Sequence, residues 1–160
     1  MELKTVKIDI PEGGNVIIGQ THFIKTVEDI YEAIVTSVPQ AKFGIAFCEA
    51  SGPCLVRSDG NDDRLKTAAA ENAMKIAAGH TFVILIENGY PINILNRLKE
   101  VPEVCSIYCA TANPVDVVVA DNERGRGVMG VIDGERPKGI ESAKDVEDRK
   151  AFLRMIGYKR

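Results

Sequence analysis

Two histidines are the side chains of this sequence best suited to nucleophilic chemistry near neutral pH. His22 lies beside Lys25 and Thr26, just before a segment with helical periodicity, so an anion bonded to its ring would face helix N–H groups and a lysine. His80 joins Gly79 to an apolar segment, a confined place in which the ring could be held in one tautomer. The alternative for either histidine is a structural side chain that is hydrogen-bonded to the backbone.

A glycine-rich segment matches the pattern G-x-G-x-x-G, with its glycines at Gly125, Gly127 and Gly130. The dinucleotide-binding fingerprint requires a helix directly after this pattern, whereas residues 131–134 (VIDG) are typical of a strand and a turn, so a Rossmann site is excluded. A glycine-rich hairpin can still bring backbone N–H groups close to phosphate oxygens, because no side chains intervene. The alternative is a tight turn and a strand packed closely on its neighbour.

Three loops that we expect to follow strand ends carry short polar side chains. In open α/β sheets, loops at the carboxyl ends of the strands form the ligand crevice. Hydroxyl, amide and carboxylate groups suit hydrogen bonds to a ribose or a base, although Asn, Ser, Gly and Pro are also simply turn formers. The candidate binding residues in these loops are Glu49, Ser51, Asn93, Thr111 and Asn113.

The four cysteines, Cys48, Cys54, Cys105 and Cys109, form no recognisable metal or redox motif. None belongs to a C-x-x-C pair, and a tetrahedral zinc site would need further ligands from a chain with only two histidines. We therefore expect four thiols that pack as small apolar side chains. The sequence also lacks a Walker A lysine motif, a G-x-S-x-G elbow and an H-E-x-x-H motif.

Length and composition are those of a single globular domain. The chain has 160 residues, of which 45% are hydrophobic and 27% are charged. The net charge of −3 argues against a dedicated nucleic-acid-binding protein. No run of about 18 apolar residues predicts a membrane span, and the N-terminus lacks the apolar stretch of a signal peptide. We expect a cytoplasmic protein with one domain over residues 1–160.

The hydrophobic periodicity predicts the elements that must position these residues. Residues 5–10 alternate as a half-exposed strand, and residues 16–18 are expected to return beside them as a hairpin. Helical spacing predicts a helix over 26–38 with Thr26 as N-cap, and another from residue 61 or 62 to 78 with Gly79 as C-cap. Five consecutive apolar residues within 81–87 predict a strand covered on both faces. Further strands are expected over 42–49, 54–57, 104–110, 115–120 and 125–134, and further helices from Pro91 and over 145–156.

Strands that follow one another without a helix between them indicate antiparallel pairing. The predicted fold is a single α/β domain, with a mixed β-sheet and helices packed on its faces. The end of the chain, from within the last helix onward, is basic: residues 149–160 carry five basic and no acidic side chains. These cations suit a helix C-terminus, and a subunit contact is a second use for them.

Long strings of the sequence resemble the adenosine-specific kinase family, a small group found largely in archaea and some bacteria. The resemblance spans about residues 16–159, in family order, and is much more specific than any single motif above. Cys54 and residues 58–63 fall where variable residues are expected. The matching strings are GQTHFIKTVEDIYEAIVTSVP, KFGIAFCEASG, AAENAMKIAAGHTFVIL, YPINILN, VPEV, ATANPV, GRGVMGVIDG and RKAFLRMIGYK.

The resemblance implies an α/β domain that binds adenosine or its nucleotides and assembles into trimers or larger oligomers such as hexamers. It also implies phosphoryl transfer through a phosphohistidine, with ATP or another phosphoryl donor. Both His22 and His80 fall inside matching strings, and the local sequence favours His22 as the nucleophile, because Lys25 and a helix N-terminus follow it.

Residue types suggest the remaining roles in such a reaction. Lys25 and Arg126 would offset charge on the transferring group, and Gly125, Gly127 and Gly130 would present backbone donors. Asn93, Thr111 and Asn113 would hold the ribose or base, and Asp133 would hold Mg²⁺ through an oxygen. Two other classes of function stay open: a sensor that binds adenosine or AMP without turnover, and a scaffold subunit whose helices mainly build an oligomer.

Overall fold

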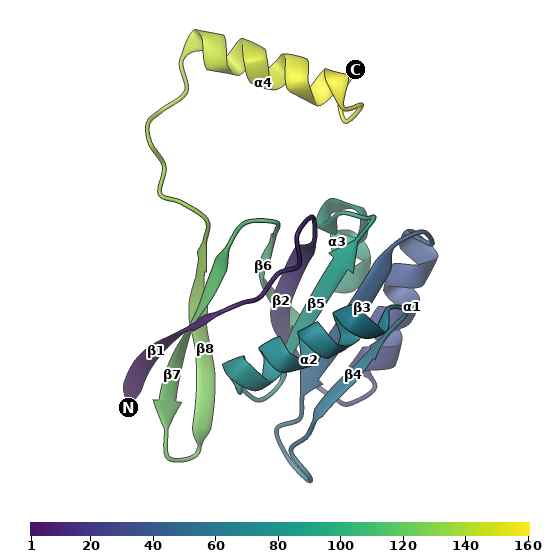
Figure 1. Cartoon of the computed structure of the whole chain (residues 1–160), viewed down its shortest axis with the longest axis vertical. Helices are drawn as coiled ribbons and strands as arrows, with labels where there is room; N and C mark the ends of the chain where they lie inside the picture. Colours follow the sequence, from purple (N-terminus) through teal and green to yellow (C-terminus); the bar gives the residue numbers. More distant parts are fainter.

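The large sheet of the molecule has five strands in the order β4-β3-β5-β2-β6, and every neighbouring pair is antiparallel. The structure is a computed structural model that describes residues 1–160 (Figure 1). The five strands are β2 (Asn15–Thr21), β3 (Lys42–Cys48), β4 (Val56–Gly60), β5 (Thr81–Glu87) and β6 (Val104–Thr111).

A smaller sheet contains β1 (Glu2–Lys7), β7 (Val115–Asn122) and β8 (Gly125–Asp133), again antiparallel and in the order β1-β7-β8. The predicted hairpin of the first two strands is therefore wrong, because β1 and β2 lie in different sheets. The connection between them is held by a helix side chain instead. The Asn72 amide donates to the Asp9 carbonyl (2.8 Å) and accepts from the Asp9 N–H (2.9 Å), so it satisfies the backbone that a hairpin would have paired.

Three helices cover the large sheet. The helices α1 (Thr26–Ser37) and α3 (Pro91–Lys99) lie on one face, and α2 (Asp63–Ile76) lies on the other (Figure 1). Each face has its own buried apolar cluster, and β5 contributes alternate residues to both, which explains its unbroken apolar run. Where α2 crosses β3 the backbones come so close that a Cβ at Gly44 would overlap the backbone of Leu65 and Lys66.

The fourth helix, α4 (Ala143–Met155), stands away from both sheets at the end of an extended segment (Figure 1). None of its residues is buried. It begins two residues before the predicted start because Ser142 caps it: the Ser142 hydroxyl accepts from the Asp145 N–H, and the Asp145 carboxylate accepts from the Ser142 N–H. No helix of the molecule combines the length and the apolar character that a bilayer crossing requires.

The structure confirms the α/β class with helices packed on sheet faces, and it resolves the predicted mixed sheet into two antiparallel sheets. Two predicted helix caps are wrong. Lys25, not Thr26, is the N-cap of α1, because the Thr26 hydroxyl donates backwards to the Phe23 carbonyl (2.7 Å). The helix α2 ends at Ala77, which takes the left-handed conformation (φ +51°) expected for Gly79.

Candidate functional site

Antiparallel pairing places the predicted polar loops at two opposite ends of the large sheet. Phe47 of β3 pairs with Phe82 of β5, so the chain after β3 and the chain before β5 meet at one end, called here the histidine end. This end carries Glu49, Ser51, His80 and, after β2, the segment from His22 to Lys25. Thr111 pairs with Val16 at the other end, called here the far end, which also carries Asn93 and Asn113. The single strand-end crevice expected from parallel sheets is therefore split in two.

His80 is held in place at the histidine end by its backbone and its ring. Its N–H donates to the Cys48 carbonyl (2.8 Å), and its carbonyl accepts from the Thr21 N–H (2.9 Å), so the residue links β3 and β2 just beyond β5. Its φ of +62° lies in the left-handed region, which is uncommon for a residue with a side chain. The imidazole stacks on the Phe47 ring, with ring centres 5.9 Å apart and planes 18° apart.

Glu49 and Arg57 form an ion pair at the same end of the sheet. The Arg57 guanidinium donates to Glu49 Oε1 (2.7 Å), and the Leu55 N–H donates to Glu49 Oε2 (2.8 Å). These donors, the Leu55 amide first, lower the pKa of Glu49 below its ordinary value and keep the carboxylate charged. Arg57 pairs directly with Phe47, so both side chains lie on the sheet face that holds the stacked His80 ring.

Arg57 is a site residue that the sequence analysis missed. Its Nε–H is buried and has no hydrogen-bond partner, which leaves an unused donor at the histidine end. The side chain also lines a pocket of about 560 Å³ at the first turn of α1, together with Lys25 and Ser58. The signal available in the sequence was a lone arginine in a short strand after the Glu49 loop, and that signal is weak without the pairing register.

His22 and Lys25 lie at the same end but in a different setting. The His22 side chain is exposed, and the backbone N–H of His22 donates to the Glu103 carbonyl (3.0 Å). The Lys25 ammonium pairs with the carboxylates of Asp29 and Glu103, the latter at 2.8 Å and only 2% exposed. The hydrogen bonds that the Lys25 ammonium donates to these two carboxylates, Asp29 first, raise the pKa of Lys25. Its charge is thus neutralised within the protein, in contrast to the free cation expected from sequence.

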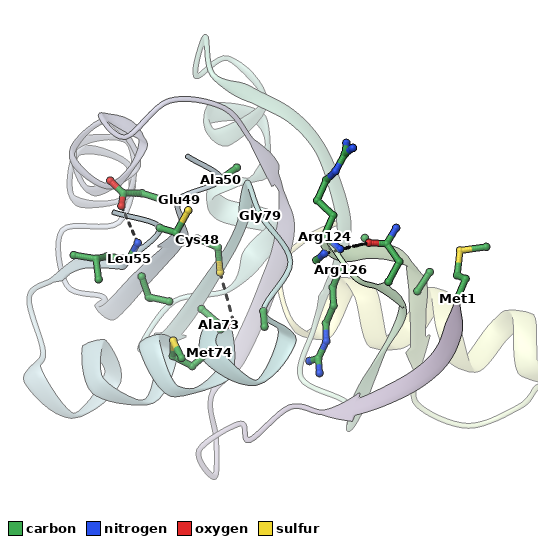
Figure 2. Close-up of a pocket in the computed structure, with 17 residues that line it drawn as sticks. Met1, Cys48, Glu49, Ala50, Leu55, Ala73, Met74, Gly79, Arg124 and Arg126 are labelled. Atoms are coloured by element: carbon green, nitrogen blue, oxygen red, sulfur yellow. Dashed lines mark hydrogen bonds between the residues drawn. The ribbon is translucent and has the colours of Figure 1, made fainter. Parts of the chain in front are cut away.

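A second pocket, of about 650 Å³, lies between α2, the Glu49 loop and the β7–β8 hairpin, and we call it the nucleoside-sized pocket (Figure 2). Figure 2 shows Cys48, Ala73 and Met74 on one side and Met1 with two arginines on the other. More than half of the lining residues are hydrophobic, as is usual for a small-molecule site. The pocket brings together four predicted binding residues, Glu49, Gly125, Arg126 and Gly127, and it reaches Gly79, the neighbour of His80.

The two arginines of this nucleoside-sized pocket have different roles. The Arg126 guanidinium pairs with Asp121 (3.0 Å) and donates to the carbonyls of Lys75 (3.0 Å) and Ile76 (3.4 Å), so it caps the end of α2. Arg124 lines the same pocket with an exposed side chain and makes no salt bridge. Arg124, rather than the predicted Arg126, is therefore the cation free to meet an anionic ligand.

The remaining predicted residues are not brought into either pocket. Gly130 lies in the middle of β8, and Ser51 lies in the exposed turn between β3 and β4. At the far end, the Asn113 amide donates to Asp133 (3.0 Å) and its N–H donates to the Thr111 hydroxyl (3.0 Å), while Asn93 caps α3. No group of three or more His, Cys, Asp or Glu side chains is arranged to hold a metal ion, at Asp133 or elsewhere.

The cysteines divide into two classes instead of the single buried class that was expected. Cys48 and Cys109 are buried, and desolvation raises the pKa of each thiol to about 11. Cys54 and Cys105 are exposed, and Cys54 lines the nucleoside-sized pocket. All four are free thiols.

Comparison with known proteins adds a family to this geometry. No curated protein matches the chain. Among solved structures, the chain is similar to the PH1918 protein from Pyrococcus horikoshii OT3, with 48% sequence identity, a TM-score of 0.96, and coverage of 99% of this chain and 98% of that chain. A family model described as "Adenosine specific kinase" matches residues 6–159. This match covers nearly the whole chain, including α4 and every residue of both pockets except Met1, and the protein therefore belongs to the adenosine specific kinase family.

Proposed function

We propose that the protein is a phosphotransferase that acts on adenosine or an adenine nucleotide, with ATP or a related donor, and that His80 carries the phosphoryl group. The family supports kinase activity. The observation that supports His80 is its fixed ring, which lies over Phe47 at the end of the sheet where Glu49 and Arg57 converge. A nucleophile that is already oriented needs little reorganisation to reach a transition state.

In the proposed reaction, an imidazole nitrogen of His80 attacks the γ-phosphorus of ATP. The N–P bond forms as the bond to the bridging oxygen breaks, and ADP leaves with the electron pair. A hydroxyl oxygen of adenosine then attacks the same phosphorus, the N–P bond breaks, and the hydroxyl proton is released to water. The unpartnered Nε–H of Arg57 would donate to an oxygen of the phosphoryl group on His80.

The nucleoside-sized pocket would hold the adenosine moiety. Ala73, Met74 and Leu55 offer apolar contact for a base, and Arg124 offers its free charge to a phosphate of the nucleotide. Asp133 lies at the far end, bonded to Asn113, so we propose that Mg²⁺ enters as part of the donor nucleotide, bound to its phosphates.

One observation favours the alternative of an adenosine or AMP sensor without turnover. Lys25 is neutralised by two carboxylates and Arg126 by Asp121 and the end of α2, so fewer free cations surround the histidine end than phosphoryl transfer usually recruits. A sensor would use the same pocket and leave both histidines structural.

Intact-protein mass spectrometry after incubation with ATP separates these functions. We expect an acid-labile gain of one phosphate, lost on addition of adenosine, that is absent in His80→Gln and present in His22→Gln. Circular dichroism would confirm that both variants are folded. Labelling of folded His80→Gln but not of His22→Gln would move the phosphate to His22. Tight adenosine binding with no label on the wild type would establish the sensor.

The family resemblance also carries an expectation of assembly, and we propose a homo-oligomer, a trimer or a hexamer. Sedimentation velocity at micromolar concentration would test this directly, because a monomer has a mass of only 17.4 kDa.

A further inference from the structure

The C-terminal arm, defined here as residues 134–160, makes no hydrogen bond or ion pair with the rest of its own chain beyond Gly134, whose N–H donates to the Pro114 carbonyl (3.0 Å). It leaves the end of β8 as an extended segment and ends in α4, which buries none of its residues (Figure 1). Yet it carries several large apolar side chains in contact with solvent, of which Met155 is 75% exposed; the others are Ile140, Phe152, Ile156 and Tyr158. A helix of 13 residues is marginally stable alone in water, so this arm requires a surface to pack on.

The same extended placement exists in an experimental structure. The PH1918 crystal structure superposes on this chain with a TM-score of 0.96 over 99% of its residues. A score so close to 1 over that coverage requires the arm residues, about a sixth of the chain, to lie in the same place in both proteins. The arm therefore does not fold back onto its own domain in that relative, although its linker is long enough to allow it.

A matching unpartnered surface exists on the outer face of the small sheet. The strand register aligns Leu3 with Ala120 and Gly127, and Asp116 with Ile132, on the face that points away from the core valines of β7. Leu3, Ile132 and Met129, which protrudes at a β-bulge, are large, apolar and exposed, and Met129 is 66% exposed. Several large exposed apolar side chains along one sheet face are typical of an interaction site.

The charges of the two parts are complementary. The arm contains eight basic and five acidic residues, a net charge of +3, whereas residues 1–133 contain twelve basic and eighteen acidic residues, a net charge of −6. Arms of like charge repel each other, whereas an arm and a domain of opposite charge attract. This favours docking of the arm on the domain of another copy.

We propose that the C-terminal arm docks on the outer face of the small sheet of a second copy of this chain. Phe152 and Ile156 of the arm would cover Leu3, Met129 and Ile132 of the partner domain, and the basic end of the arm would meet a domain of opposite net charge. Met1, Ala120 and Gly127 at the edge of this face also line the nucleoside-sized pocket, so the docked arm lies beside the pocket mouth. The proposal rests on the arm and the sheet and does not depend on the chemistry at His80.

The test uses the full chain and variants of side chains that are exposed in the single chain, so that folding is retained. An arm variant combines Phe152→Glu with Ile156→Glu, and a sheet variant combines Met129→Glu with Ile132→Glu. Ile92→Glu is the matched control, because Ile92 is equally exposed but lies on α3, away from the small sheet. Sedimentation velocity measures the mass, and circular dichroism checks the fold of each protein.

We expect the wild type and the control to sediment as the same oligomer, and the arm and sheet variants to sediment as 17.4 kDa monomers. Mixing the two variants should produce a two-chain complex, because one intact arm then meets one intact sheet. A monomeric wild type would overturn the proposal, and so would an arm or sheet variant of unchanged mass, a dissociated control, or a mixture that stays monomeric.

Discussion

Replacement of Gly44 by alanine should destabilise the protein by about 3 kcal/mol, the upper end of the range for overpacked cores. The added Cβ would overlap backbone atoms of Leu65 and Lys66 in the first turn of α2, and helix backbone cannot rotate aside as a side chain can. The helix α2 would have to move away from β3 as a unit. For a domain of this size the loss corresponds to roughly 6–12 °C in Tm. The same movement would shift Ala73 and Met74, so adenosine binding should weaken as well.

Thermal unfolding followed by circular dichroism, at one fixed protein concentration, measures the loss of stability. Isothermal titration with adenosine measures the loss of binding affinity. Gly127→Ala is the control, because a Cβ at Gly127 meets no atom within 4 Å. We expect this control to change the free energy of unfolding by less than about 1 kcal/mol, in the stabilising direction. A Tm for Gly44→Ala within about 2 °C of the wild type would refute the close approach of α2 and β3.

At pH 8, an aromatic disulfide reagent should modify the two exposed cysteines quickly, and Cys48 and Cys109 about a hundredfold more slowly, because burial raises the pKa of those two thiols to about 11. Equal reaction rates for all four cysteines would contradict the burial of Cys48 and Cys109. Asn72→Ala should lower the free energy of unfolding by about 1–3 kcal/mol, since it removes both hydrogen bonds that the buried Asn72 amide makes with the Asp9 backbone, and urea unfolding would measure it. The pKa of Glu49 is lowered by folding, so its carboxylate contributes stability above pH 4.5 that is lost as the pH falls through the lowered pKa. The difference in Tm between the wild type and Glu49→Gln should therefore be largest near pH 6 and shrink below pH 4.5, and a difference independent of pH would exclude this carboxylate as the cause.

Most elements of the fold could be predicted from local patterns, because periodicity and turn residues act over a few positions. The apolar run of β5 and the proline at the start of α3 are examples. The choice of strand partners could not be predicted. The strand β1 looks like half of a hairpin, but its register is decided by β7, far away in the sequence, and by Asn72 in a helix.

The candidate site depended on that same long-range information. With parallel strands the polar loops would have met at one edge, whereas antiparallel pairing separates Glu49 from Asn113 by the length of a strand. Arg124 and Arg126 look equivalent in sequence, but alternation along β8 directs Arg126 inward to the end of α2. Arg57 gains its interest only from its register partner Phe47.

The pairing of β1 with β7 has a consequence for the order in which the molecule is made. The ion pair between Lys4 and Asp121 joins residues 117 positions apart, whereas all five strands of the large sheet lie within residues 15–111. During synthesis the first strand to leave the ribosome must therefore wait, unpaired, until the large sheet and three helices have been made. Closing so long a loop is slow, so the small sheet should be the last part of the domain to form. Until β1 pairs with β7, that edge of β7 stays open. A chain without residues 1–7 would leave the edge available for pairing with other chains.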